Sequence, residues 1–409
     1  MLMEISILSL RAQAEAEAVM REIGVDGGGI KIMAPKTQIC LARISRLPIF
    51  AANILKQEAL SIGADAAVSR DALTGRAKYT DCLIIGNQYQ IDKLCEKLKI
   101  QPYGLNKAAA RLKQACFNYR RSKWTLDFGR YKLDLKSHTH IMGIVNLTPD
   151  SFSGDGLLAA TGCRPQVADI VEYAQKLVDE GADIIDIGGE SSRPGAKPVP
   201  LKEELQRVIP AIKKIAGKIK VPVSIDTSKA EVAHQALDNG AAIVNDITAL
   251  RGDSKMAKIV SLHKAGLVVM HMKANPKAMQ KNPRYHNLFQ EIIEYLGKAI
   301  NVACDAGVDF EKIIVDPGIG FGKSPEHNLQ IIKSLEQLKI LGRPILIGAS
   351  RKSFIGKITG LPVSQRLFAS IGSNCLSVLN GAMLVRVHDV QETKQALSVL
   401  DSILKAGLG

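Results

Sequence analysis

The sequence is poor in the features that mark secreted, membrane and nucleic-acid-binding proteins. Aromatic residues are only 4% of the 409 residues, with one Trp, and no basic stripe alternates with aromatics as in surfaces that stack single-stranded bases. No apolar run approaches the roughly 18 to 20 residues of a membrane span. The first residues lack the basic segment and long apolar run of a signal peptide. These absences predict a cytoplasmic protein that binds neither nucleic acid nor membranes.

Disulfide and zinc patterns are also missing. The seven cysteines are an odd number, lie far apart and include no C-x-x-C pair, which is typical of reduced thiols in the cytoplasm. The histidines never occur at H-E-x-x-H or similar spacing, so a zinc site is not expected. His234 is interpreted as a solvent-facing or packing residue within a helix.

Aliphatic residues and positive charge are abundant. Hydrophobic residues make up 46% of the sequence and are mostly Ala, Ile, Leu and Val, which is the composition of an α/β protein. The formal net charge of +14 would attract a polyanion or, equally well, a small phosphorylated substrate.

Residues 1–137 are interpreted as a smaller N-terminal α/β or α+β domain of unknown role. They contain a predicted helix at 15–23 and short predicted strands at 30–33, 38–42 and 82–86. The basic run at 111–123 is interpreted as the solvated face of a helix, with binding to an acidic partner as the alternative.

From His138 to the end at 409 the chain repeats a short apolar strand, a polar or glycine-rich loop and a helix. The strands are predicted at 141–146, 184–187, 223–226, 243–246, 268–272, 313–316, 345–347 and 383–387. Eight such units predict a (β/α)8 TIM barrel, with an open doubly wound sheet as the competitor. Because every strand lies beyond Lys136, a chain that begins there is expected to fold and remain active.

Polar side chains stand where these strands end, and in a barrel those ends meet on one face. Asp316 and Asn245 suit a flat, nitrogen-rich heterocycle, because a carboxylate and an amide match the donors and acceptors of an amidine edge. Arg386 and His388 end the last strand, where barrels commonly hold phosphate. The segment 350–353 ends the seventh strand and could accept a small anion. The sequence therefore predicts one site on this face.

Residues 138–409 resemble the dihydropteroate synthases of the folate pathway along their whole length. The matching motifs are 142–153, 186–195, Ser224-Ile-Asp-Thr227, Asn245-Asp246, Asp316-Pro-Gly-Ile-Gly-Phe-Gly-Lys323, 348–356 and Val385-Arg-Val-His388. The resemblance implies a barrel enzyme that joins 6-hydroxymethyl-7,8-dihydropterin pyrophosphate to 4-aminobenzoate with Mg²⁺. A homodimer is also expected.

The resemblance implies a role for each matching residue. The catalytic group would be Asp226, Asp316, Lys352, Arg386 and His388. The pterin would be held by Asp226, Asn245, Met270, Asp316, Lys352 and Arg386, and the pyrophosphate by Asn146, Arg193, Arg386 and His388. The aminobenzoate pocket would contain Phe152, Ser192, Pro194, Phe321 and Ser353, with Ser192 where the family usually has Thr. Asn146 would bind the metal. Asp155 stands one position away from the family's metal-binding Asp, which leaves its role open.

Two other functions fit parts of this pattern. A pterin-dependent methyltransferase would share the acids but would not need the anion groups at 350–353 and 386–388. A non-catalytic pterin-binding or regulatory protein would be expected to have lost motif residues, and the motifs are all present.

Overall fold

The computed structural model describes residues 5–10, 13–148, 167–191, 198–273 and 283–406. The chain divides into two compact units, which are described separately. One consists of Met1–Phe117 with Lys405–Gly409, and the other is Asn118–Leu404.

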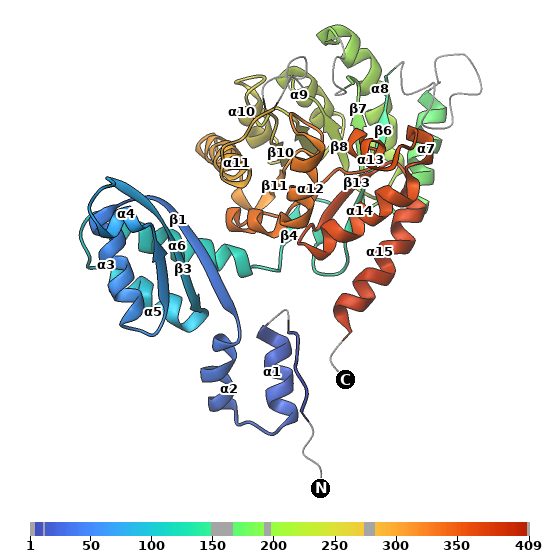
Figure 1. Ribbon diagram of the computed structural model, residues 1–409. Coiled ribbons are helices and arrows are strands. Elements are labelled where there is room, and N and C mark those ends of the chain that lie inside the picture. The colour runs from blue at the N-terminus through green and yellow to red at the C-terminus, as the bar shows by residue number, and fades with distance from the viewer. Residues whose placement is uncertain (1–4, 11–12, 149–166, 192–197, 274–282, 407–409) are drawn as a thin grey trace. The chain divides into compact units, whose positions relative to one another are not determined.

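The larger unit is a closed barrel of eight parallel strands, which confirms the predicted fold (Figure 1). In sheet order they are β11 (Ile313–Asp316), β10 (Gly266–Met270), β9 (Ile243–Asp246), β8 (Val223–Asp226), β7 (Ile184–Gly188), β6 (His140–Asn146), β13 (Leu384–Val387) and β12 (Leu346–Ile347). A parallel bridge between Val315 and Ile345 joins the two ends of this series. The strands are almost wholly buried, as expected for a parallel sheet covered by helices.

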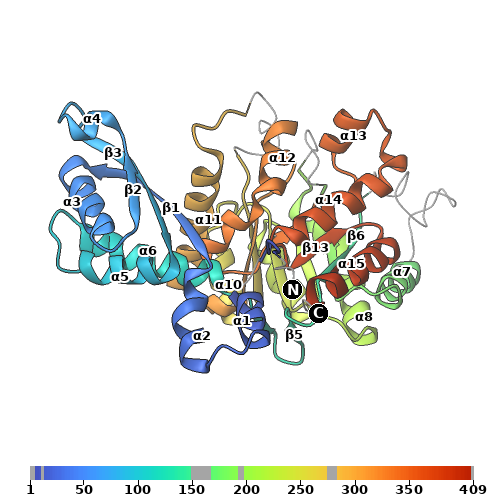
Figure 2. The same cartoon turned by 60° about the horizontal axis from the view of Figure 1, so that its bottom comes forward.

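Helices follow the strands and surround them (Figure 1, Figure 2). They are α7 (Val167–Asp179), α8 (Leu201–Lys218), α9 (Ala230–Asp238), α10 (Met256–Leu262), α11 (Leu288–Asp305), α12 (Pro325–Lys333), α13 (Ser353–Thr359), α14 (Leu367–Leu379) and α15 (Val390–Lys405). Short 3₁₀ helices lie at Phe310–Lys312, Leu335–Leu341 and Val363–Gln365. On α8, the buried residues Val208, Ala211, Ile212 and Ile215 recur at helical spacing and turn one face to the sheet. No described helix is both long and apolar enough to cross a membrane.

A β-hairpin closes the barrel at the end where its strands begin. It is formed by β4 (Thr125–Asp127) and β5 (Lys132–Asp134), which pair antiparallel. Its side chains Trp124, Leu126 and Phe128 form one buried cluster with residues of the barrel strands. A Cβ on Gly266 would lie 2.4 Å from a ring carbon of Phe128, so only glycine fits at the start of β10. The hairpin is therefore part of the barrel core.

The division between the units falls earlier than the sequence suggested. The contacts separate the chain between Phe117 and Asn118, in the last turn of α6 (Leu105–Arg120), and not after residue 137. The physical reason is the hairpin, whose apolar side chains are buried against the barrel strands and whose strands are too short to have a core of their own.

The N-terminal unit is a three-stranded antiparallel sheet packed against helices. The sheet order is β1 (Ile39–Pro48), β3 (Tyr79–Asn87) and β2 (Asp65–Val68). The helices are α1 (Gln13–Glu22), α2 (Gly27–Met33), α3 (Ile49–Leu60), α4 (Arg70–Leu73), α5 (Gln88–Leu98) and α6, with a 3₁₀ turn at Ala34–Lys36. Leu55, Ile84, Ile91 and Leu94 are fully buried in its core. This is the small α+β arrangement expected for the region.

Two local predictions in this unit have opposite outcomes. The predicted strand at 30–33 is wrong, because those residues belong to α2. The Asp26 carboxylate caps that helix by accepting hydrogen bonds from the backbone N–H groups of Gly28 and Gly29, at 2.8 and 3.0 Å. The predicted helix is confirmed for most of the basic run, since α6 buries Leu112 and exposes Arg111 and Lys113, and the choice between a solvated face and an acidic partner stays a prediction.

Candidate active site

Two carboxylates on neighbouring strands, the buried Asp186 within β7 and the partly buried Asp226 at the end of β8, share one guanidinium group. Arg386 on β13 donates from Nε to Asp186 Oδ2 at 2.6 Å and from Nη2 to Asp226 Oδ2 at 3.0 Å. The Asn245 amide on β9 donates to the same Asp186 oxygen at 3.1 Å. The predicted residues Asp226, Asn245 and Arg386 therefore meet around Asp186, which the sequence analysis gave no role.

The negative charge of Asp226 is only partly compensated by Arg386. Burial raises the pKa of Asp226 to about 7, and Asp186, Glu204 and Asp246 push it in the same direction against the opposing effect of Arg386. Asp186 Oδ1 is buried and has no hydrogen-bond partner among the described residues. An unsatisfied buried acceptor is costly, so this group of acids is suited to a ligand rich in N–H donors.

Asp316 ends β11 beside a buried lysine. Its Oδ1 accepts a 2.6 Å hydrogen bond from the Gly318 N–H, and burial raises the pKa of its carboxyl group. Lys323 donates to His271 Nδ1 at 2.9 Å and to the Phe321 carbonyl at 3.1 Å. Burial lowers the pKa of Lys323 to about 7 and that of His271 to about 2, so His271 is neutral and its Nδ1 can accept. Lys323 thus ties the loop after β11 to the end of β10.

An apolar wall completes this side of the site. Met270, Met272 and Phe321 form a small buried cluster. The Lys352 ammonium lies 4.4 Å from the centre of the Phe321 ring, a cation–π distance. Ser353 begins α13 directly after Lys352 and is exposed. The predicted residues Met270, Phe321 and Lys352 therefore lie together, next to the acids.

The predicted anion groups are held by neighbouring polar side chains. Ser350 Oγ lies 3.1 Å from His388 Nδ1 and also accepts from the His388 backbone N–H at 3.3 Å. Arg351 forms an ion pair with Asp389, so its charge is already matched. Asn146 ends β6, and a Cβ on Gly188 would lie 3.5 Å from the Asn146 amide oxygen and 3.6 Å from Asp226 Cβ. The missing side chain of Gly188 thus leaves a gap of about methyl size beside Asn146 and Asp226.

Comparison with known proteins identifies the family. Residues 142–388 match the family model described as pterin binding enzyme. A curated dihydropteroate synthase from Clostridium beijerinckii is 42% identical over 281 residues, which are 68% of this chain and 100% of that protein. The chain belongs to the dihydropteroate synthases.

Solved structures of the family agree with this assignment. A Yersinia pestis dihydropteroate synthase in complex with a sulfonamide drug superposes with a TM-score of 0.65 and 38% identity, covering 69% of this chain and 100% of that one. A Xanthomonas albilineans dihydropteroate synthase with 4-aminobenzoic acid gives a TM-score of 0.64 and 39% identity, covering 70% and 100%. The similarity to these two structures therefore covers about the length of the barrel unit of this synthase-family chain.

Some predicted residues lie outside the described part of the chain. Phe152 and Asp155 fall within residues 149–166, and Ser192, Arg193 and Pro194 fall within 192–197. Their assignments to the aminobenzoate pocket, the pyrophosphate and the metal stay predictions.

A second buried network, which the sequence did not predict, lies behind β8. Glu204 on α8 is fully buried, accepts from Thr227 Oγ1 at 2.7 Å and pairs with Lys229. Lys229 also pairs with Glu190. These contacts fix the segment that follows Asp226. One signal was available for Asp186, since a single carboxylate inside the apolar run Ile184–Ile187 must have a partner.

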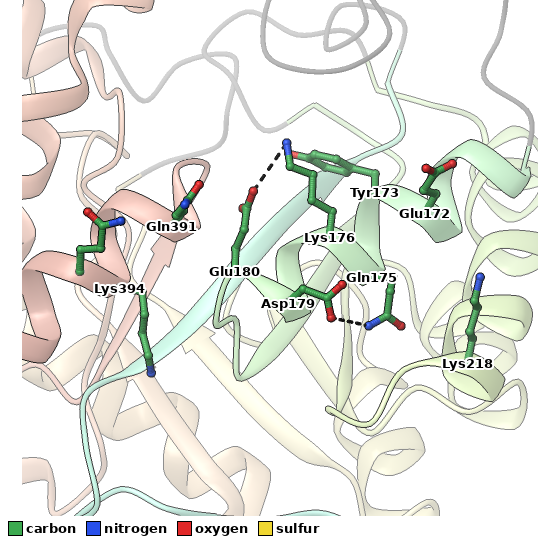
Figure 3. A pocket seen from close by; sticks show the side chains of 10 residues that line it. Glu172, Tyr173, Gln175, Lys176, Asp179, Glu180, Lys218, Gln391 and Lys394 are labelled. Carbon is green, nitrogen blue, oxygen red and sulfur yellow. Dashed lines mark hydrogen bonds and ion pairs between the residues drawn. The ribbon is translucent and has the colours of Figure 1, made fainter.

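A separate groove of about 660 Å³ lies on the outer surface between α7, α8 and α15 (Figure 3). It is lined by side chains such as Tyr173, Lys176, Lys218 and Lys394. None of its lining residues is a predicted site residue, and they belong to outer helices rather than strand ends. We place the active site at the strand ends, because the paired acids and the matching motifs are there.

The missed Lys323 gives a first prediction. Lys323→Met leaves the carbonyl and imidazole acceptors around its ammonium without a donor, so the free energy of unfolding should fall by about 2–3 kcal/mol. Urea denaturation measures it. Lys333→Met, at an exposed position of α12, is the matched control and should change little. Equal stability of the two variants would show that the buried ammonium contributes nothing.

Proposed function

We propose that the chain joins 6-hydroxymethyl-7,8-dihydropterin pyrophosphate to 4-aminobenzoate, giving 7,8-dihydropteroate and pyrophosphate. The observation that carries this proposal is the set of carboxylate acceptors on the barrel strands, with Asp186 and Asp316 buried, Asp226 partly buried and Arg386 hydrogen-bonded between Asp186 and Asp226. A pterin presents several N–H donors in one plane, which such acceptors can satisfy. The names of the similar proteins support the same reaction.

The pterin would lie among the acids and against the apolar wall. Asp316 and Asn245 would bind its amidine edge, and Met270 would pack against the ring. Lys352 would approach from the side of Phe321, over which its ammonium already lies. Carboxylates aimed at the ring also favour positive charge that develops on it.

The reaction would exchange one bond for another. The bond between the pterin methylene carbon and the pyrophosphate oxygen breaks, and its electron pair leaves with pyrophosphate. The amine nitrogen of 4-aminobenzoate then forms a C–N bond to that carbon and loses a proton to water. Asp226 and Asp316 would stabilise the cationic pterin, while Arg386 and His388 would stabilise the departing pyrophosphate. Arg386 uses only two of its five N–H donors on the carboxylates, so donors remain for an anion.

The donor set at the end of β6 fits Mg²⁺. This ion prefers oxygen ligands and is commonly held by one or two protein groups together with substrate phosphates. Asn146 offers an amide oxygen at the end of β6, next to Gly188 of β7, and Asp155 would be a second ligand. When bound, the ion would neutralise charge on the pyrophosphate oxygens.

The 4-aminobenzoate would bind beside the apolar wall. Phe321 would contact its ring and Ser353, which begins α13, would bind its carboxylate. Phe152, Ser192 and Pro194 would complete the pocket, and Arg193 would help to hold the pyrophosphate.

The deciding experiment mixes the purified chain with the pterin pyrophosphate, 4-aminobenzoate and Mg²⁺ and follows pyrophosphate release. We expect release that requires the amine and yields a product with the absorbance of dihydropteroate. Pterin binding without release would favour a binding or regulatory protein. Methyl transfer from a reduced folate to a corrinoid protein would favour the methyltransferase alternative.

We infer a homodimer formed through the last helices. Phe368 and Leu376 on α14 and Val399 and Ile403 on α15 are large apolar residues that are exposed in the single chain, Phe368 by 83%. The two helices lie side by side in both views (Figure 1, Figure 2). Burying such a surface against a second copy would remove it from water. Light scattering on the wild type and on Phe368→Asp tests this, and an unchanged mass would contradict it.

A cytoplasmic location is part of the same proposal. The six described cysteines are all free thiols, and Cys82 and Cys95 are buried. Burial raises the pKa of each of these two thiols to about 11, which keeps them unreactive.

The pKa of Asp226 predicts how pterin binding depends on pH. The carboxylate form is needed for an N–H donor ligand, and its pKa is raised to about 7, so binding should be strong above pH 7 and weaken as the pH falls through 7. Calorimetry with 6-hydroxymethylpterin, which has no phosphate of its own to titrate, measures this. Asp226→Asn should bind more weakly and without that pH dependence. A transition near pH 4 in the wild type would contradict the prediction.

A further inference from the structure

Three side chains on the outside of the barrel bring metal-ligand atoms together. His234 and Asp238 lie one turn apart on α9, and His263 caps the end of α10, which packs beside α9. All three lie shortly before a strand begins, β9 for the first two and β10 for His263. They are therefore at the end of the barrel opposite to the active site.

The distances among the three groups fit one coordinated ion. His234 Nδ1 and His263 Nε2 are hydrogen-bonded to each other at 3.0 Å, so a bound ion would take the place of the proton between them. The Asp238 carboxylate oxygens lie 3.6 Å from the first nitrogen and 3.8 Å from the second. Ligands about 2.1 Å from a tetrahedral zinc ion are about 3.4 Å apart, so the three separations lie on either side of the ideal value. Small side-chain movements would equalise them.

The orientation of the rings also allows shared coordination. The imidazole planes of His234 and His263 are tilted by 58°, so the lone pairs of the facing nitrogens can converge on one point. A second group, His138, His140 and Asp183, lacks this property, because its imidazoles are stacked with planes only 12° apart. There, His138 Nε2 is already bonded to Asp183 at 2.8 Å, and the other oxygen of Asp183 accepts from the Ile141 N–H. That second group is a hydrogen-bonded structural cluster.

The first group is also open to solvent. The side chains of His234, Asp238 and His263 are 37, 52 and 19% exposed, so an ion could enter from water and keep water as its remaining ligand. Two imidazoles and one carboxylate are a donor set that suits Zn²⁺ and similar divalent transition ions better than Mg²⁺. The spacing of the histidines in the sequence predicted no zinc site. That rule covers only ligands within one segment, and it does not apply here because His234 and His263 come from two helices.

We propose that His234, Asp238 and His263 form a binding site for a divalent transition-metal ion such as Zn²⁺, linking α9 to α10. The site is independent of the proposed reaction and shares no residue with it. Because the ion would bind the folded arrangement only, it would raise the stability of the barrel.

The test compares zinc binding by the full chain and by variants, after removal of metals with a chelator and with Mg²⁺ in excess. Calorimetry should show that His263→Gln loses one zinc equivalent per chain and that Asp238→Asn binds that equivalent at least about tenfold more weakly. His286→Gln, an exposed histidine elsewhere, is the control and should keep it. The sulfurs of Cys40 and Cys116 lie 4.0 Å apart, and zinc held by such thiols would be the same in every variant. It therefore does not affect the difference between the variants.

Spectroscopy and stability provide independent readouts. Co²⁺ in place of Zn²⁺ should give visible absorption in the wild type that is missing in His263→Gln. Zinc should raise the thermal midpoint of the wild type and of His286→Gln but not of His263→Gln. Equal zinc stoichiometry and affinity in the wild type and His263→Gln, or no zinc-dependent stabilisation of the wild type, would overturn the proposal.

Discussion

A chain that begins at Lys136 should fail to form a stable barrel, whereas one that begins at Asn118 should fold and keep its activity. The shorter chain lacks Trp124, Leu126 and Phe128, whose side chains are 3, 0 and 8% exposed in the core at the closed end. Truncating one such residue to Ala typically costs about 2–5 kcal/mol. Losing all three would remove about 6–15 kcal/mol, which is as large as the roughly 5–15 kcal/mol by which most domains are stable.

The measurement is the soluble yield of each chain, followed by circular dichroism and the pyrophosphate-release assay. The expected failure of the chain that begins at Lys136 is the opposite of the prediction from the sequence alone, which considered only the eight strands. Two chains of equal solubility and activity would mean that the hairpin is dispensable. A milder variant, Phe128→Ala, should remain folded but be less stable, and it separates loss of packing from loss of the whole segment.

Asp316→Asn should lose pterin binding while the fold survives. The substitution keeps the shape and an oxygen that can accept from the Gly318 N–H, but it removes the negative charge and replaces one acceptor with a donor. A hydrogen bond to a charged group contributes about 3 kcal/mol at most, which is roughly a hundredfold in Kd. Calorimetry with the pterin measures the loss, and the rate of pyrophosphate release should fall at least as far.

Asp246→Asn provides the matched control. Asp246 is also a buried carboxylate at a strand end, but its oxygens accept from Thr248 and from the Leu250 N–H, at 2.6 to 2.8 Å, and so form a turn. Its replacement should lower stability and leave the pterin affinity of the folded protein nearly unchanged. If Asp316→Asn bound pterin as tightly as the wild type, the assignment of Asp316 would be wrong.

The sequence predicted the barrel well because its signal is local and repeated. Each apolar run flanked by glycine or proline marks a buried strand, and the polar residue after it marks the active face, as at Asp226 and Asp316. The hairpin was not predicted, because Thr125–Asp134 is short and its apolar residues are buried only by contact with the barrel strands. The His234–His263 pair was not predicted for a similar reason, since its members come from different helices.

The role of single residues followed the same rule. Asn245 and Arg386 could be assigned to the site from their place near the end of a strand. Lys323 could not, because its position in a glycine-rich loop suggests a solvent-exposed lysine, whereas the loop folds back and buries it against His271.

The hairpin that closes the barrel also determines when the barrel can be completed during synthesis. The ribosome makes Trp124 and Phe128 before any barrel strand, yet the cluster that buries them includes Leu346 on β12 and Leu384 on β13, near the end of the chain. Contacts between residues so far apart in sequence form slowly. The hairpin is thus synthesised first and buried last, and its aromatic side chains stay available for aggregation or for a chaperone until β13 has emerged.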